Sequence, residues 1–251
     1  MAYQSILNWS GGKDSALALY HSLKDPQYAV GRLLTSINST YARVTMHGVR
    51  EVLLEQQARN IGLPLQKLML PEQPGMEEYN RLMSETMEGL KSEGFTHSIF
   101  GDIFLEDLKK YREEQLAQKG FSAYFPLWKR DTTDLLHEFL DLGFKTILVC
   151  TKADVLDESF AGRHIDRDFL KDLSGLPAYV DPCGENGEFH TFVFDGPIFN
   201  KPVDFTVGEK VYREYRSPKE AGDDADAPAQ APMGFWFCDL LPVQEQGDKI
   251  L

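Results

Sequence analysis

The chain has 251 residues, of which 42% are hydrophobic and 12% aromatic, as is ordinary for a globular protein of one large or two modest domains. No apolar run approaches the roughly 20 residues that span a bilayer. The chain enters its first strand at once, so we expect no signal peptide, no membrane contact and a cytoplasmic protein. The net charge of −13 disfavours a nucleic-acid partner. Three cysteines, at 150, 183 and 238, lie too far apart for a disulfide framework or a Cys-x-x-Cys site.

Strands and helices alternate through the first half of the chain. Hydrophobic periodicity predicts strands at 3–9, 30–37, 65–70, 97–103 and 122–127, and helices at 14–23, 49–60, 76–94 and 106–119. This alternation predicts an α/β fold, a doubly wound parallel sheet flanked by helices. Ligands of such sheets bind beyond the carboxyl ends of the strands. We assign residues 1–127 to this domain.

The alternation loosens after residue 127. We expect helices at 132–142 and 166–175, a strand at 146–150, and strands at 189–194 and 203–212 that pair as a hairpin. Residues 128–216 are therefore predicted to form a smaller C-terminal α+β domain. Residues 217–233 are rich in proline, alanine and acidic side chains, which predicts a disordered acidic linker. The apolar segment at 234–251 is expected to dock on the protein or on another subunit of a homo-oligomer.

A glycine turn, Ser10-Gly11-Gly12-Lys13-Asp14-Ser15, joins the first strand to the first helix. Adjacent glycines let the backbone bend sharply and let a ligand approach closely. Ser10, Asp14 or Ser15 can cap the helix, whose N-terminus favours an anion, and Lys13 adds a positive charge. The Walker A and dinucleotide-binding patterns both fail on the spacing of the glycines. The turn is therefore predicted to be a phosphate-binding loop of another type.

The Ser-Gly-Gly-x-Asp-Ser pattern resembles the PP-loop of the ATP pyrophosphatases. Together with the stretches at 101–106, 126–131 and 184–191, it resembles the diphthine–ammonia ligase family from residue 3 to residue 194. The most distinctive parts are Pro-Leu-Trp-x-Arg-Asp from 126 and Gly-Glu-Asn-Gly-Glu-Phe-His-Thr from 184. The resemblance implies a HUP-type, PP-loop nucleotide-binding domain at 1–127, over which the smaller substrate domain at 128–216 closes.

The resemblance also implies an amide ligase that uses ATP and Mg²⁺. ATP adenylates a substrate carboxylate with loss of pyrophosphate, and ammonia then displaces AMP. The carboxylate acceptor of the family is diphthine, a modified histidine on an elongation factor. Because the predicted site lies before residue 217, deletion of 217–251 is expected to cost little nucleotide binding.

Roles for individual residues follow from the same resemblance. The nucleotide-binding set is Ser10, Gly11, Gly12, Lys13, Asp14, Ser15, Thr35, Ser36 and Gly101. Asp14 and Asp102 are candidate Mg²⁺ ligands, and helix capping is the alternative for each. The catalytic set is Lys13, Asp102, Glu185, Glu188 and His190, and the substrate-binding set is Trp128, Arg130, Glu185, Asn186 and Glu188. Two carboxylates and an imidazole suit a cationic substrate group and a proton relay from ammonia, and the face of Trp128 suits a trimethylammonium group.

Several motifs also have a purely structural interpretation. Residues 184–191 can be a turn with solvated glutamates, Arg130 and Asp131 an internal ion pair, and Arg112 and Glu113 the solvent-facing side of a helix. Two other functions stay open: a PP-loop enzyme acting on a tRNA base or a small bacterial acid, and a non-catalytic nucleotide-binding regulator. The cysteine spacing and the acidic charge disfavour tRNA thiolation, and Lys13-Asp14-Ser15 disfavours a mere regulator.

Overall fold

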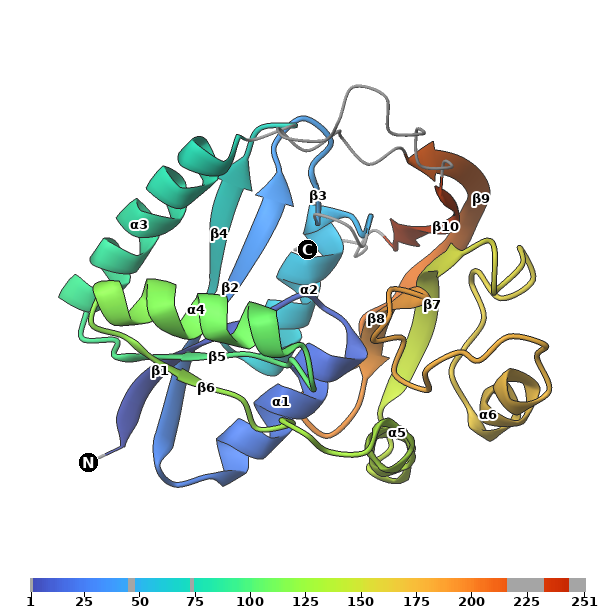
Figure 1. Cartoon of the computed structure of the whole chain (residues 1–251), viewed down its shortest axis with the longest axis horizontal. Coiled ribbons are helices and arrows are strands. Elements are labelled where there is room, and N and C mark those ends of the chain that lie inside the picture. The colour runs from blue at the N-terminus through green and yellow to red at the C-terminus, as the bar shows by residue number, and fades with distance from the viewer. Residues whose placement is uncertain (1, 45–47, 73–74, 216–232, 244–251) are drawn as a thin grey trace, which may run out of the picture.

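The computed structural model describes residues 2–44, 48–72, 75–215 and 233–243, and within them the chain forms two sheets (Figure 1). The first sheet has six strands in the order β3-β2-β1-β5-β6, with β4 also paired to β2. Its strands are β1 (Tyr3–Asn8), β2 (Tyr28–Asn38), β3 (Arg43–Val44), β4 (Leu65–Leu70), β5 (His97–Ile99) and β6 (Ser122–Tyr124). All pairs are parallel except β2 with β3. The predicted parallel sheet is confirmed.

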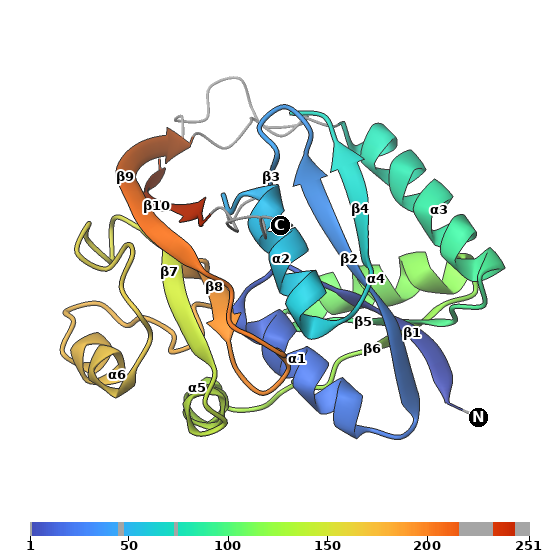
Figure 2. The same cartoon turned by 180° about the vertical axis from the view of Figure 1, so that it is seen from behind.

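Four helices cover this sheet: α1 (Lys13–Lys24), α2 (Glu51–Ile61), α3 (Met76–Ser92) and α4 (Glu106–Gln118). Helices α1 and α2 lie on one face, and α3 and α4 lie on the other (Figures 1 and 2). Consecutive residues of β1 point to opposite faces, so that Leu7 joins the core cluster of Leu17 in α1, while Ile6 joins that of Met87 in α3. The sheet is therefore doubly wound.

Strands β5 and β6 are shorter than the sequence predicts, since they end at Ile99 and Tyr124 and not at 103 and 127. The apolar pattern continues beyond both strands because Ile103 and Leu127 are fully buried, at 0% exposure. These side chains enter the core from turns outside the sheet. A buried apolar residue in the turn after a strand therefore gives the same sequence pattern as a longer strand.

The second sheet is antiparallel and has the order β8-β7-β10-β9. Its strands are β7 (Lys145–Lys152), β8 (Phe189–Asp195), β9 (Phe205–Tyr215) and β10 (Met233–Pro242), accompanied by the helices α5 (Thr132–Asp141) and α6 (Arg167–Ser174). The predicted hairpin of β8 with β9 is wrong, because β8 pairs with β7 and β9 pairs with β10. The C-terminal apolar run docks as β10 between β7 and β9.

Buried side chains of the two sheets form one continuous cluster, which runs from Leu7 and Leu17 to Leu148 and Leu240. The division into domains at 127 and 128 stays a prediction. The linker predicted at 217–233 lies outside the described residues except for Met233. Among the helices of the described residues, none is long and apolar enough to cross a membrane.

Candidate functional site

The loop at 10–15 that is predicted to bind phosphate, called the phosphate loop below, lies between β1 and α1, at the carboxyl end of a central strand. Gly11 has a φ of +80°, in the left-handed region that favours glycine. Gly12 is the N-cap of α1, and none of the side chains predicted to cap the helix does so. The Ser15 hydroxyl instead donates to the Gly12 carbonyl at 2.9 Å, and Ser10 Oγ lies 3.1 Å from Ser15 Oγ. The N-cap residue itself therefore has no side chain that competes with an anion.

Strand β8 of the second sheet holds this loop directly. The Val193 N–H donates to the Gly11 carbonyl at 2.9 Å, and the Lys13 N–H donates to Thr191 Oγ1 at 3.0 Å. Thr191 is the last residue of the distinctive stretch at 184–191 and had no predicted role of its own. Its hydroxyl supports the loop between β1 and α1.

Lys13 is a buried cation at the start of α1, with 4% of its side chain exposed. Its Nζ pairs with Asp14 Oδ1 at 2.7 Å and lies 5.6 Å from the centre of the Phe189 ring. Burial opposes the charge, but Asp14 and Glu185 more than offset it, so the pKa of Lys13 lies above its usual value. The loop therefore holds a fixed positive charge at neutral pH.

Two further carboxylates share this electrostatic environment. Burial, followed by the charge of Asp14, raises the pKa of Glu185 well above its usual value, although Lys13 acts in the opposite direction. Burial also raises the pKa of Asp102 in spite of the nearby Arg112. Asp14 and Asp102 keep 32% and 12% of their side chains exposed. The structure thus brings Lys13, Asp14, Asp102 and Glu185 into one site from three separate parts of the chain.

Arg112 is a member of this site that sequence reasoning missed. It was expected on the solvent-facing side of its helix, but its guanidinium group pairs with Asp102 and lies 4.4 Å from the centre of the Phe100 ring. A signal was present in the sequence: Leu108, Arg112 and Leu116 follow at intervals of four, which places them on one helix face. Because Leu116 is buried, that face is directed towards the sheet.

The loop from 181 to 188 is held together by its own carboxylates. Glu188, which is 5% exposed, accepts hydrogen bonds from the Asp181 N–H at 3.0 Å, the Asn186 N–H at 2.9 Å and Asn186 Nδ2 at 3.0 Å. Asp181 accepts from Thr132 Oγ1 and from the Cys183 N–H, both at 2.8 Å. Glu188 and Asn186 therefore support the loop, and Glu185 is the glutamate that acts on Lys13.

His190 lies on β8 between Phe189 and the loop-supporting Thr191. Burial, together with the charge of Lys13, lowers the pKa of His190 to about 4. Its imidazole is therefore neutral at physiological pH. A neutral ring can accept a proton or donate a hydrogen bond, but it adds no positive charge to the site.

Arg130 and Trp128 have partners of their own, away from the phosphate loop. Arg130 pairs with Glu138 at 2.6 Å and lies 3.2 Å from His21 Nε2, so it links α5 to α1. Asp131 caps α5 by accepting from the N–H groups of residues 133 and 134, and the alternative of an Arg130–Asp131 ion pair is wrong. Lys109 Nζ lies 4.9 Å from the centre of the Trp128 ring, so a cation already occupies the environment proposed for a trimethylammonium group.

Thr35 and Ser36 lie near the carboxyl end of β2, next to β1. Thr35 is 3% exposed, and its Oγ1 is one of two buried side-chain oxygens without a hydrogen-bond partner in the described part of the chain. An unpaired buried hydroxyl beside the loop suits a polar ligand atom. Gly101 lies even closer to the loop, because a Cβ there would be 2.9 Å from the carbonyl carbon of Asp14.

A metal-binding cluster of three or more His, Cys, Asp or Glu side chains is absent from the described residues. Mg²⁺ needs less, because it usually takes one or two carboxylates and completes its shell with water and phosphate oxygens. Asp14 in the loop and Asp102 beside it, whose side chains are both partly exposed, match that requirement.

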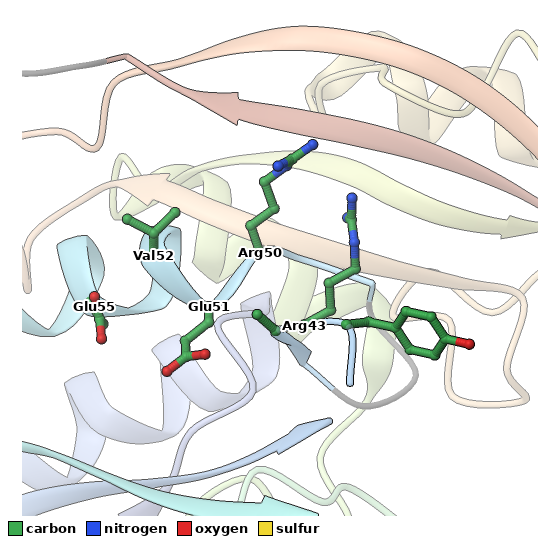
Figure 3. Close-up of a pocket in the computed structure, with 7 residues that line it drawn as sticks. Arg43, Arg50, Glu51, Val52 and Glu55 are labelled. Carbon is green, nitrogen blue, oxygen red and sulfur yellow. The ribbon is translucent and has the colours of Figure 1, made fainter. Parts of the chain in front are cut away.

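A pocket of about 280 Å³ lies elsewhere, between β3 and the first turn of α2, and its lining includes Tyr41, Arg43 and Arg50 (Figure 3). Both arginines reach towards β10, where Asp239 accepts from Arg43 at 2.9 Å and from Arg50 at 2.6 Å. The two arginines therefore share one carboxylate, and the pocket is distinct from the phosphate loop.

Comparison with known proteins places the chain in a family. Residues 3–121 match the model of the diphthamide synthase N-terminal domain, and residues 131–219 match that of the C-terminal domain. The chain is similar to the diphthine–ammonia ligase of Danio rerio, with 28% identity over 161 residues, which are 60% of this chain and 56% of that protein. It is similar to that of Mus musculus with 30% identity over 173 residues, 66% of this chain and 59% of that protein.

The chain thus spans little more than half the length of these curated relatives. Among solved structures, it resembles a U34-tRNA thiolase from Methanococcus maripaludis with its [4Fe-4S] cluster, at 14% identity and a TM-score of 0.35, covering 56% of this chain and 57% of that one. That likeness is too slight to support an inference. The two domain models together cover most of the sequence, and the chain belongs to the diphthine–ammonia ligase (diphthamide synthase) family.

Proposed function

We propose that this protein is an ATP-dependent ligase that amidates a substrate carboxylate with ammonia and forms AMP and pyrophosphate. The observation that carries the proposal is a buried, charged lysine at a helix N-terminus whose N-cap is a glycine, in a chain of the diphthine–ammonia ligase family. A buried cation is costly unless it has a purpose or a partner. Lys13 has Asp14 as its partner, and triphosphate is the anion that its position suits.

The phosphates of ATP would bind against the backbone from Gly11 to Ser15, where the amides and the helix dipole favour negative charge. Lys13 would neutralise the charge that develops on the pyrophosphate group as it leaves. Adenosine would lie at the carboxyl ends of β2 and β5, beside Thr35, Ser36 and Gly101. The unpaired Thr35 hydroxyl supports this placement.

Asp14 and Asp102 would hold Mg²⁺ when it accompanies ATP. The ion would supply further neutralisation of charge on the phosphates. Arg112 keeps Asp102 oriented, and Lys13 does the same for Asp14, so that both carboxylates are restrained before any ligand arrives.

The reaction would proceed in two displacements. An oxygen of the acceptor carboxylate attacks the α-phosphorus of ATP, the bond to the bridging oxygen breaks, and pyrophosphate leaves. The nitrogen of ammonia then attacks the carbonyl carbon of the acyl adenylate, and AMP leaves with the former carboxylate oxygen. Glu185 lies at the site with a raised pKa, and in its ionised form it would accept the proton that the ammonia nitrogen loses after its attack.

The acceptor would be diphthine on an elongation factor, as the name of the relatives indicates. The negative charge that Asp14 and Asp102 bring to the site suits the cationic group of such a substrate. The net charge of −13 disfavours a tRNA acceptor. The retained lysine and carboxylates disfavour a non-catalytic regulator.

The test is an incubation with ATP, Mg²⁺ and a diphthine-bearing elongation factor, with and without ¹⁵N-ammonium. We expect AMP and pyrophosphate to form only with the acceptor, and the labelled nitrogen to appear in the modified histidine by mass spectrometry. ADP as the product would refute the proposal. AMP formed on tRNA would favour the base-modifying alternative, and tight ATP binding without turnover on any acceptor would favour the regulator.

A further inference from the structure

Gln57 is a fully buried residue at the meeting point of α2, the phosphate loop and β8. Its Nε2 donates to the carbonyl oxygens of Gly11 at 3.0 Å and of Val193 at 2.6 Å, and its Oε1 accepts from Trp9 Nε1 at 2.9 Å. The indole nitrogen can only donate and the two carbonyls can only accept, so these partners fix the orientation of the amide. Both of its N–H groups and its oxygen are in use.

The Gly11 carbonyl is the loop atom on which these contacts converge. It accepts from Gln57 and also from the Val193 N–H at 2.9 Å. The peptide bond between Gly11 and Gly12 is trans and planar, so its C=O and N–H point in opposite directions. A carbonyl directed towards α2 and β8 therefore directs the Gly12 N–H to the other side of the loop, where it donates to Ser10 Oγ at 3.2 Å.

The glycine and the glutamine also fit each other sterically. A Cβ on Gly11 would lie 2.8 Å from Gln57 Oε1, and the φ of +80° excludes most other residues. Two adjacent glycines have more backbone freedom than any other pair, so an external contact has to select one conformation. Gln57 and Val193 provide that contact at Gly11.

We propose that Gln57 is a positioning residue of the phosphate loop, which holds the Gly11 carbonyl and thereby directs the Gly12 amide to the Ser10 side of the loop, where a phosphate oxygen of ATP would replace the Ser10 hydroxyl as its acceptor. The proposal rests on the proposed function for the identity of the ligand. Gln57 touches no substrate and acts through Gly11. Donors that are fixed in advance need no reorganisation when the anion binds, so their loss weakens binding.

The test compares Gln57→Met and Gln57→Glu with Asn60→Leu. Methionine keeps the length of the side chain but removes its hydrogen bonds, whereas glutamate keeps the shape and cannot donate when ionised. Asn60 is the matched control, because it is buried on the same helix and its Nδ2 donates to the Pro202 carbonyl at 2.9 Å, away from the loop. For each protein, the readouts are the thermal unfolding midpoint, the Kd of α,β-methylene-ATP by calorimetry, and KM for ATP against kcat for AMP formation.

We expect both Gln57 variants to raise the Kd of the analogue and the KM for ATP about tenfold, with a smaller change in kcat. We expect Asn60→Leu to lower the unfolding midpoint and to leave the Kd unchanged. Gln57 variants that lose thermal stability but keep the wild-type Kd would overturn the proposal, and so would a failure of both to fold, because Gln57 would then serve the fold alone.

The two proposals fail in different ways. Wild-type protein that binds the analogue but forms no amide refutes the proposed function, while the Kd of the variants still decides the role of Gln57. Wild-type protein that forms the amide, with variants that bind the analogue normally, refutes the role of Gln57 alone. Wild-type protein that binds no adenine nucleotide overturns both.

Discussion

Gly101→Ala tests how closely the carboxyl end of β5 approaches the phosphate loop. The added Cβ would lie 2.9 Å from the carbonyl carbon of Asp14, and 3.0 Å from both its oxygen and the Ser15 nitrogen. All three are backbone atoms of the first turn of α1, so no side-chain rotation can relieve the contact. Overpacking of this kind costs about 2 kcal/mol of unfolding free energy. The turn that must move is the one proposed to bind phosphate, so nucleotide affinity should fall as well.

The assay is urea unfolding together with the Kd of α,β-methylene-ATP. Gly89→Ala is the matched control, because Gly89 lies inside α3 with no atom within 4 Å of the new Cβ. Alanine in a helix is favoured over glycine, so the control should gain up to about 1 kcal/mol. If Gly101→Ala keeps wild-type stability and wild-type affinity, the close contact between Gly101 and the first turn of α1 does not exist, and the reasoning is refuted.

Three further predictions concern charge and the second sheet. Lys13→Ala should lower AMP formation at least about a hundredfold, since a charge-assisted contact to phosphate is worth about 3 kcal/mol. Circular dichroism should show that its secondary structure is retained. Turnover near that of the wild type would mean that the active centre lies elsewhere. The pKa of His190 is about 4 in the folded state against 6.5 for the unfolded chain, so the unfolded state binds more protons and stability is lost as pH falls from 6.5 towards 4. Between pH 7 and pH 5 the wild type should lose about 2 kcal/mol more than His190→Gln in urea unfolding, and equal slopes would contradict the neutral imidazole. Deletion of residues 217–251 should lower the unfolding midpoint by at least several degrees, because β10 joins β7 to β9; a truncated chain as stable as the full one would show that the sheet closes without it.

The sequence predicted that the apolar segment at 234–251 docks and that loss of 217–251 costs little nucleotide binding, but it did not predict this loss of stability. The composition of this region gave no sign that its apolar run enters the middle of a sheet. Strand order depends on contacts between residues far apart in the chain. For the same reason the sequence paired β8 with β9, its neighbour in the chain, whereas β8 pairs with β7.

Local sequence determined much of the fold and the position of the site. The alternation of strand and helix periodicity identified the doubly wound parallel sheet, and the two glycines before Lys13 marked the loop that we propose to bind phosphate. Both signals come from residues adjacent in the chain, where backbone freedom and side-chain spacing act directly. The family motifs added Glu185 and Asp102 to the candidate site.

Tertiary structure alone decided which of these polar side chains share a site. In the folded protein, Glu188 accepts hydrogen bonds within the loop at 181–188, Glu185 lies near Lys13, and Arg112 pairs with Asp102. It also placed Gln57 against Gly11; the spacing from Leu53 and Leu54 puts Gln57 on the buried face of α2 but does not show which partner it meets there. A buried polar group must find a partner, and which partner it finds depends on how distant elements pack. The sequence shows which chemical groups are present, and the packing of distant elements decides which of these groups form hydrogen bonds with one another.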